Sequence, residues 1–465
     1  MLLFPTLSAP AFHGVFPLLA QVEDSAQALS NAEVEPFVLT GVLLSLVVIF
    51  LASKVGGELC ARIDLPPVLG ELVGGVVVGL SVLKLLAFPE EGSSVPGEDS
   101  LIMALLERTA GMPHAAIPQV FTSQSEIIST LSELGVILLL FEIGLESDLK
   151  ELIRVGPQAA IVAVVGVAVP FATGTLGLIT LFHVPTIPAI FAGAALTATS
   201  IGITAKVLAE IQQLSSKEGQ IIIGAAVLDD VLGIIVLAVV ASLVKTGEVK
   251  ITGILWLVVA AVVFLLGAIL LGRFLSPFFV TLVNNLKTRG QLLVVALIFA
   301  FILSYIAAAI HLEAILGAFA AGLVLAETEK RRELEEQVVP LADFFVPIFF
   351  VVVGARTDLS VLNPFVPSNR EGLIIATFLV TVAIVGKVVT GLTVFGQEPT
   401  NRLAIGIGMI PRGEVGLVFA GVGTATGVLS DSLDAAIIVM VIFTTFIAPP
   451  LLRVAFQRKP AEQES

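Results

Sequence analysis

Two adjacent carboxylates, Asp229 and Asp230, lie near the middle of an apolar stretch, 217–244, that is long enough to cross a membrane. A crossing helix needs about 20 apolar residues. A charged carboxylate at its centre costs roughly 2.5–3.5 kcal/mol on insertion scales, so such residues are rare. Two neighbouring carboxylates cost more because like charges repel. A carboxylate in this position can hold a proton or a desolvated cation, so the pair indicates ion chemistry inside a membrane; a purely structural buried network is the less favoured alternative.

Helix geometry separates the roles of the two carboxylates. Consecutive residues are about 100° apart around a helix and about 1.5 Å apart along it, so the two side chains cannot face the same partner. Lys387 lies deep in another apolar stretch, TVAIVGKVVTG, and needs a carboxylate partner if it is buried. We therefore predict a pair between Lys387 and Asp229, and the alternative is a Lys387 side chain that reaches the membrane surface.

Hydroxyl groups gather in the predicted span 187–211. Its sequence LTATSIGIT places Thr197, Thr199, Ser200 and Thr204 within one short stretch of an otherwise apolar helix. Hydroxyl and carboxylate oxygens suit a hard cation such as Na⁺. We predict that Thr197, Thr199 and Ser200, together with the aspartates, bind ions and protons.

A second interruption lies in the predicted span 401–427, at GIGMIPRGEVG. Pro411 cannot donate to the helix ladder. Arg412 and Glu414 are expected to pair with each other or with charges on neighbouring helices, and so to shape the break. Interrupted helices expose main-chain groups at membrane depth, which is tolerated where those groups line a protein cavity or an ion site.

Two further carboxylates, Glu71 and Glu142, fall within predicted spans. Either one could shape a path for protons or cations, and either could only line a wet funnel. The sequence around them does not separate these roles.

The composition is that of an all-α polytopic membrane protein. Of the 465 residues, 57% are hydrophobic and 13% are charged, and the mean hydropathy is +1.05, whereas soluble domains carry about 25% charged residues. Runs of about 20 apolar residues indicate helices and not barrel strands. The net charge of −14 does not suggest a nucleic-acid partner. We predict roughly thirteen spans, at 36–53, 66–87, 127–145, 155–182, 187–211, 217–244, 250–272, 290–310, 313–327, 341–355, 371–395, 401–427 and 434–452.

The distribution of Lys and Arg predicts the orientation. These residues are concentrated in the connections on one side, which is expected to be cytoplasmic. The N-terminus is then outside, or in a lumen, and the C-terminus is cytoplasmic. Thirteen spans divide as six, one and six, which predicts an inverted repeat with an interrupted helix at the fifth span of each half.

At this point the motifs resemble a known family. The stretches LPPVLGELVGGVVVGL, ALTATSIGITAKVL, IIIGAAVLDDVLGIIVLA, IVGKVVTG and GMIPRGEVGL, in this order from Leu65 to about Leu417, resemble the monovalent cation/proton antiporter-2 family in its Na⁺/H⁺ (NapA-like) branch. The short acidic N-terminal extension is similar to that of cyanobacterial and thylakoid members.

The resemblance implies a secondary active antiporter that exchanges Na⁺ or Li⁺ for H⁺ by alternating access and is electrogenic. It implies that Asp230 carries ions and protons and that Asp229 pairs with Lys387. From the hydroxyls of the predicted span 187–211 we expect Thr199 to join Asp230 as a Na⁺ ligand. Such a protein is not an enzyme and has no cofactor.

The resemblance also implies an assembly and an organisation. We expect a homodimer in a bacterial inner membrane or a thylakoid membrane, with an NhaA-like fold containing two crossed discontinuous helices. The expected parts are an outer-side segment at 1–35, one antiporter domain at 36–455, and a short cytoplasmic tail at 456–465. Within the domain, a core bundle is expected around 127–244 and 341–427, and a dimerisation bundle from the remaining helices.

Two alternatives stay open. A K⁺/H⁺ antiporter of the same family would share these motifs, and a sodium-coupled solute symporter would also use broken helices and Na⁺ sites.

An intramembrane aspartyl protease needs its two Asp residues on different helices, and adjacent residues such as Asp229 and Asp230 cannot form that dyad. A channel would need a repeated pore loop or filter, which the sequence does not show.

Overall fold

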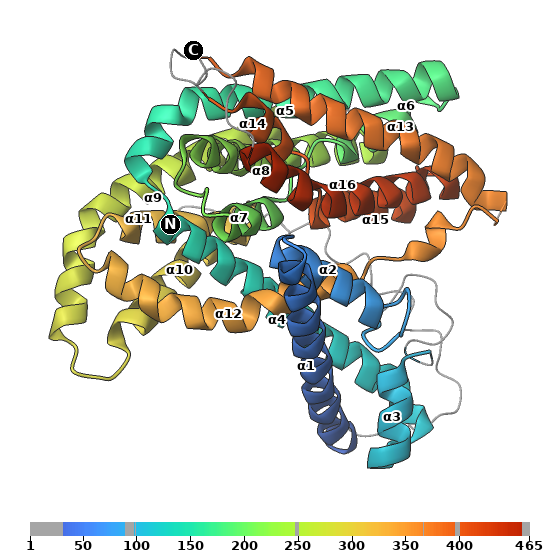
Figure 1. The fold of residues 1–465 in the computed structure, drawn as a ribbon, viewed down its shortest axis with the longest axis horizontal. Helices are drawn as coiled ribbons and strands as arrows, with labels where there is room; N and C mark the ends of the chain where they lie inside the picture. Colours follow the sequence, from blue (N-terminus) through green and yellow to red (C-terminus); the bar gives the residue numbers. More distant parts are fainter. Residues whose placement is uncertain are drawn as a thin grey trace, which may run out of the picture.

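The computed structural model describes residues 31–88, 97, 99–246, 251–365, 367–395 and 400–457, and every regular element in them is a helix (Figure 1). The predicted all-α fold is confirmed for this part of the chain. Most of the expected N-terminal segment (1–30) and of the expected C-terminal tail (458–465) lies outside the described residues.

Eight of the described helices are long and apolar enough to cross a membrane. Shorter apolar helices accompany them, and two of these, at 67–78 and 314–326, have 12 and 13 residues. The protein is therefore a multi-pass membrane protein. The eight long spans are Val34–Arg62, His114–Glu146, Leu149–Phe182, Lys217–Val240, Gln291–Ala309, Arg331–Ala355, Asn369–Thr393 and Asp431–Gln457.

One group of helices packs around α4, and we call it the α4 bundle. Glycines allow the closest approach within it: a Cβ atom added at Gly144 of α4 would lie 2.4 Å from the carbonyl oxygen of Phe319, and one at Gly322 of α11 would lie 2.2 Å from that of Phe141. The bundle consists of α1 (Asn31–Arg62), α2 (Pro67–Val78), α4 (Ile117–Glu146), α10 (Gln291–Ala309), α11 (Ala314–Ala326) and α12 (Arg331–Ala355), with α3 (Leu101–Ala110) against α1 and a 3₁₀ turn, η1 (His114–Ala116), before α4.

The remaining helices form a second group, the α8 bundle, in the upper half of Figure 1. Helix α9 (Ile251–Asn285) contacts both α8 and α11 and so connects the two groups. The α8 bundle consists of α5 (Leu149–Phe182), α6 (Thr186–Ala195), α7 (Ile201–Glu210), α8 (Lys217–Thr246), α13 (Pro367–Thr390), α14 (Arg402–Gly408), α15 (Glu414–Ala425) and α16 (Asp431–Gln457), with the 3₁₀ turns η2 (Leu359–Leu362) and η3 (Gly391–Thr393).

This grouping by contacts differs from the bundle boundaries expected from the sequence. Segments 127–145 and 341–355 were expected in the core bundle, but α4 and α12 pack on each other and on α1, α2 and α11. Segment 434–452, expected with the dimerisation helices, packs as α16 on α13, α14 and α15. One reason is a close approach that hydropathy cannot show: a Cβ atom at Gly135 of α4 would lie 2.5 Å from the carbonyl oxygen of Phe345 in α12.

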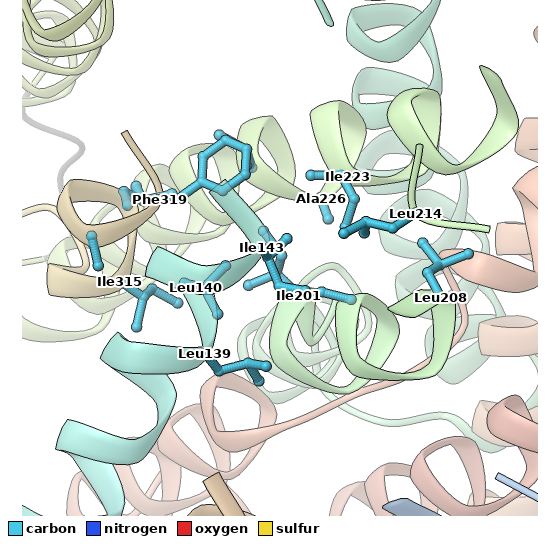
Figure 2. Packing of buried hydrophobic residues seen from close by; sticks show 14 of the residues in the cluster. Leu139, Leu140, Ile143, Ile201, Leu208, Leu214, Ile223, Ala226, Ile315 and Phe319 are labelled. Carbon is cyan, nitrogen blue, oxygen red and sulfur yellow. The ribbon is translucent and has the colours of Figure 1, made fainter. Parts of the chain in front are cut away.

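The boundary between the two bundles includes a cluster of apolar side chains from α4 and α7. Figure 2 shows Leu139 and Ile143 of α4 beside Ile201 of α7, within a cluster of buried hydrophobic side chains. Such a cluster holds the bundles together by van der Waals packing, since lipid tails are as apolar as these side chains, and it needs few directional bonds.

Candidate functional site at the crossing of two broken helices

Two helices are interrupted, and the interruptions lie against each other. Helix α6 ends before Leu196 and α7 begins after Ser200, while α14 ends at Gly408 and α15 begins after Gly413. The Ser200 N–H donates to the carbonyl of Pro411 at 2.8 Å. Both interruptions fall where the sequence predicted them. Each break therefore satisfies main-chain groups that the other leaves without a helical partner.

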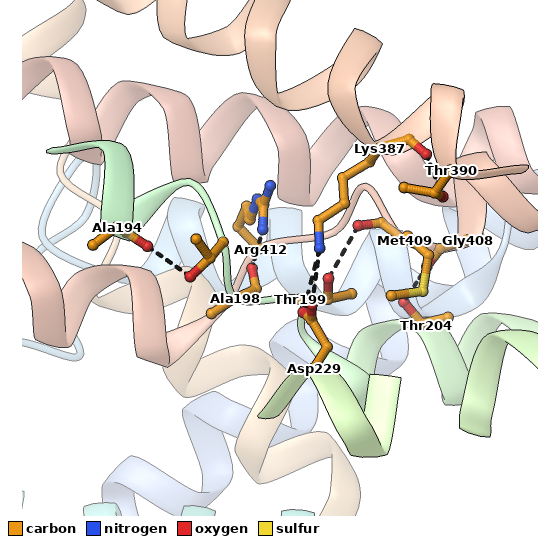
Figure 3. A network of polar contacts seen from close by, with 11 residues as sticks. Ala194, Ala198, Thr199, Thr204, Asp229, Lys387, Thr390, Gly408, Met409 and Arg412 are labelled. Carbon is orange, nitrogen blue, oxygen red and sulfur yellow. Dashed lines mark hydrogen bonds and ion pairs between the residues drawn. The ribbon is translucent and has the colours of Figure 1, made fainter. Parts of the chain in front are cut away.

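Hydroxyl side chains tie the two breaks together as well. The Thr204 hydroxyl donates to the Gly408 carbonyl at 2.9 Å, and the Thr199 hydroxyl donates to the Met409 carbonyl at 3.2 Å (Figure 3). A Cβ atom at Gly413 would lie 2.7 Å from the Ser200 Oγ atom. The crossing is thus packed at van der Waals distance, with Gly413 making room for Ser200.

The ion pair predicted between Lys387 and Asp229 is present. The Lys387 Nζ atom lies 3.1 Å from Asp229 Oδ1 and 3.3 Å from Oδ2, and both side chains are fully buried (Figure 3). Helix α5 leaves space for the ammonium group at Gly166, where a Cβ atom would lie 3.2 Å from Nζ. Lys387 therefore does not reach the membrane surface.

Arg412 is fully buried and bridges the two breaks. Its guanidinium donates to the carbonyl of Ala198 and also interacts electrostatically with Asp229 (Figure 3). The sequence did not indicate this main-chain partner. Glu414 begins α15, and its side chain lies outside the described part of the chain. Arg412 places positive charge at the crossing, beside the Asp229–Lys387 pair.

Asp230 faces a small cavity beside the crossing. The cavity has a volume of about 10 Å³, which is room for the centre of roughly one water-sized particle. Its lining joins both breaks, helix α8 and the start of α11. The lining residues are Ala198, Thr199, Ser200, Ile201, Asp230, Glu313, Ile315, Gly413 and Val415.

The oxygens around this cavity can hold a proton or a hard cation. Asp230 is 5% exposed, and Thr199 and Ser200 are also buried. A hydroxyl that donates one hydrogen bond keeps lone pairs for a cation, so the Thr199 oxygen is free to coordinate although its proton goes to Met409. Carboxylate and hydroxyl oxygens form the donor set that Na⁺ favours.

Three predicted site residues lie elsewhere. The Thr197 hydroxyl donates to the Ala194 carbonyl at 2.8 Å, and Thr197 does not line the cavity. Glu71 accepts a hydrogen bond from Ser53 at 2.9 Å. Glu71 and Glu142 both interact electrostatically with Lys206, so they belong to a charged group between α2, α4 and α7 and not to the Asp230 cavity.

One lining residue was missed by sequence reasoning. Glu313 comes before α11 and reaches the cavity from the α4 bundle. The only signal in the sequence is a carboxylate at the start of a short apolar stretch, and nothing in the spacing connects it with Asp230.

Crossed helices that are interrupted beside a buried carboxylate are the architecture of secondary ion transporters. The family model described as "Sodium/hydrogen exchanger, transmembrane" matches residues 38–458, and the chain belongs to this family. Its members are transporters, so the predictions that the protein is not an enzyme and uses no cofactor are confirmed.

Individual relatives support the same placement. The chain is 67% identical to the high-affinity Na⁺/H⁺ antiporter NhaS3 of Synechocystis, over 98% of this chain and 97% of that protein. It is 32% identical to the Na⁺/H⁺-K⁺ antiporter GerN of Bacillus cereus, over 88% of this chain and 95% of that protein. In fold it resembles the sodium proton antiporter MjNhaP1 of Methanocaldococcus jannaschii, with a TM-score of 0.59 at 15% identity, covering 90% of this chain and 97% of that one.

Proposed function

We propose that the protein is a secondary active antiporter that exchanges Na⁺ or Li⁺ for H⁺ at Asp230. The observation that carries the proposal is the cavity in which Asp230 meets Thr199 and Ser200 at the crossing of the broken helices. One carboxylate cannot hold a proton and a cation at once, so the two compete for it. If the site opens to only one side of the membrane at a time, competition between the proton and the cation leads to their exchange across the membrane.

The Asp229–Lys387 pair has a separate role in this proposal. It neutralises two buried charges close to the cavity, and it can transfer a proton between its members when the charge at Asp230 changes. A second protonatable pair beside the carrier allows more protons than Na⁺ ions to move in each cycle. We therefore expect electrogenic exchange.

Sodium is favoured over potassium by the similarity to the relative named a high-affinity Na⁺/H⁺ antiporter. K⁺/H⁺ exchange is the second candidate, because GerN is named a Na⁺/H⁺-K⁺ antiporter and the relative KhtU of Bacillus subtilis, at 28% identity, is named a K⁺/H⁺ antiporter subunit. A sodium-coupled solute symporter is the candidate from a different class.

The topology belongs to the same proposal. We propose roughly thirteen crossings in a six, one and six arrangement, in which α6 with α7 and α14 with α15 each form one discontinuous span. The short helices α2 and α11 and the apolar stretch Thr252–Ala268 of α9 supply crossings besides the eight long ones. An inverted repeat of this kind places one broken helix in each half. The N-terminus is outside or in a lumen and the C-terminus is cytoplasmic, as the distribution of Lys and Arg favours.

The two bundles are proposed to move against each other during alternating access. The α8 bundle contains Asp230 and both breaks, so it acts as the core, and the α4 bundle acts as the dimerisation scaffold of a homodimer. The proposed location is a bacterial inner membrane or a thylakoid membrane.

Reconstitution tests the function. The purified protein is placed in liposomes that contain a pH-sensitive dye, a pH gradient is imposed, and Na⁺, Li⁺ or K⁺ is added without any organic solute. Na⁺ and Li⁺ are expected to move protons, and an imposed membrane potential is expected to change the rate. Equal responses to K⁺ and Na⁺ would favour the K⁺/H⁺ candidate, and no response without a solute would favour the symporter.

Asp230→Asn is the matched variant, because it keeps the shape of the side chain and removes the ionisable group. We expect it to abolish exchange while the protein elutes as the same species in gel filtration and melts at a similar temperature. Retained exchange in Asp230→Asn liposomes would remove Asp230 from the carrier role.

A further inference from the structure

The cavity at Asp230 contains a second carboxylate that comes from the other bundle. Asp230, Thr199, Ser200 and Gly413 belong to the α8 bundle, whereas Glu313 precedes α11 in the α4 bundle. The cavity therefore lies across the boundary along which the two bundles are proposed to move.

The ordinary explanation for a carboxylate at this position is a helix cap. Glu313 is the N-cap residue of α11, with φ −63° and ψ 133°, but its side chain makes no capping hydrogen bond. Glu313 is half-buried and lines the cavity beside Asp230.

The position of Glu313 in the chain brings the Asp230 cavity close to the turn between α10 and α11. Glu313 follows the exposed turn at His311 between α10 and α11. At the start of α2, the Val68 N–H donates to Glu210 Oε1 at 3.1 Å and joins the two bundles beside a cavity of about 290 Å³ that is lined by Pro67, Glu210 and Arg453. A cation at Asp230 lies in the cavity that Glu313 also lines, next to the α10–α11 turn.

We propose that Glu313 is a specificity-determining residue that contributes a second carboxylate oxygen to the bound cation when Asp230 faces the α10–α11 turn. This inference rests on the proposed antiport function. The cavity has room for the centre of roughly one water-sized particle, so one cation can contact both carboxylates. Because the two residues belong to different bundles, movement of the α8 bundle withdraws Asp230 from Glu313, and the second ligand is lost. Affinity for Na⁺ is thus higher on the Glu313 side of the cycle.

The test compares Glu313→Gln with a matched control on the same helix. Glu327, at the opposite end of α11, is exposed, and Glu327→Gln removes the same charge away from the cavity. Each protein is reconstituted, and the apparent KM for Na⁺, the maximal rate and the melting temperature are measured. For Glu313→Gln we expect the apparent KM to rise by roughly tenfold, as for loss of one charge-assisted contact, with a maximal rate within about twofold of the parent. Glu313→Asp is expected to recover part of the affinity.

The outcomes separate the inference from the function on which it rests. If the parent and Glu327→Gln exchange Na⁺ for protons and Glu313→Gln has an unchanged KM, the inference is overturned and the function stands. If Glu313→Gln lowers the melting temperature and leaves the KM unchanged, Glu313 has a structural role, and the inference is again overturned. If the parent protein does not exchange cations for protons, the proposed function fails and this inference fails with it.

Discussion

The two neighbouring aspartates differ in what their side chains meet. Asp229 contacts Lys387 and interacts with Arg412, so its charge is compensated within the protein. Asp230 is one residue further along α8, turned by about 100°, and faces a cavity lined by hydroxyls. In the proposed exchange, the same helix turn therefore supplies a structural charge at Asp229 and an exchangeable one at Asp230.

Lys387→Ala is expected to destabilise the protein by about 3–5 kcal/mol, because it leaves Asp229 as a buried charge without its ammonium partner. Lys150→Ala is the control, since Lys150 is exposed in the first turn of α5. Thermal unfolding in detergent measures the difference. The double variant Lys387→Met with Asp229→Asn removes both charges and should recover much of the stability. Equal melting temperatures for Lys387→Ala and Lys150→Ala would contradict a stabilising pair.

Thr199→Ala is expected to raise the apparent KM for Na⁺ roughly fivefold, which corresponds to about 1 kcal/mol for one lost oxygen ligand. The cavity contains Thr199 but not Thr197, so Thr197→Ala is the matched control and should leave the KM unchanged. Thr199→Ser keeps the hydroxyl and should behave like the parent. If Thr199→Ala leaves the KM unchanged, Thr199 is not a Na⁺ ligand and other oxygens of the cavity hold the cation.

At the scale of single residues, the sequence predicts the ion pairs whose members would be costly to bury alone. The Asp229–Lys387 pair could be inferred because each charge needs the other in a membrane. The contact between Arg412 and the Ala198 carbonyl could not, since every residue offers a carbonyl and only the break exposes this one. Glu313 was missed for a related reason: its proximity to Asp230 depends on how two bundles dock, which no local pattern encodes.

At the scale of elements, the crossing depends on the close packing of its two breaks. Gly413→Ala would place a Cβ atom 2.7 Å from Ser200 Oγ and 2.9 Å from Ser200 Cβ, so the breaks must separate. We expect a loss of about 1–3 kcal/mol of stability, as for other overpacked sites, together with the loss of exchange. Melting temperature and proteoliposome exchange measure the two effects.

Gly233→Ala is the control for this prediction, because its added Cβ atom would lie 3.7 Å from the nearest atom, in Ala198, which is an ordinary contact. Gly233 is on α8, three residues after Asp230, so the control tests the same region. Adding Ser200→Gly to Gly413→Ala removes the clashing side chain and should restore the melting temperature. A Gly413→Ala protein as stable as Gly233→Ala would show that the breaks have more room than their packing indicates.

The sequence predicts the positions of the helices better than it predicts which helices pack together. Apolar length located the eight long spans of the described residues, and clusters of hydroxyls, Gly and Pro located both breaks, because these features are local. The partners of each helix were not predictable in this way: α4 and α12 pack together, where Gly135 lies against the Phe345 carbonyl, although the sequence analysis placed them in the core bundle. Most membrane helices are apolar on every face, so hydropathy does not show which face meets which neighbour.

At the scale of the molecule, the boundary between the two bundles combines apolar contacts, such as those of Leu139 and Ile143 in α4, with polar contacts at one end. The polar end holds Val68 N–H against Glu210, and Arg453 of α16 donates to the Asp64 carbonyl in the α1–α2 turn. These contacts tie the start of α2 to α7 and α16. An apolar surface can slide at small cost, whereas the polar contacts must break before the bundles separate at that end.

A cross-link between the bundles at this end is therefore expected to stop exchange. Cys60 is the only cysteine in the chain, so Cys60→Ser gives a background for the paired variants Val68→Cys and Glu210→Cys, joined by a short thiol-cleavable bifunctional reagent. Proton movement driven by Na⁺ is measured before linking, after linking, and after cleavage, which should restore it. The control pair, Glu58→Cys with Arg62→Cys, replaces an ion pair of 2.9 Å within α1. In the control protein the reagent links two cysteines of the same helix, so linking should leave exchange unchanged. Full activity in the linked Val68–Glu210 protein would mean that the contact at the start of α2 persists throughout the cycle, and alternating access would then require movement elsewhere in the fold.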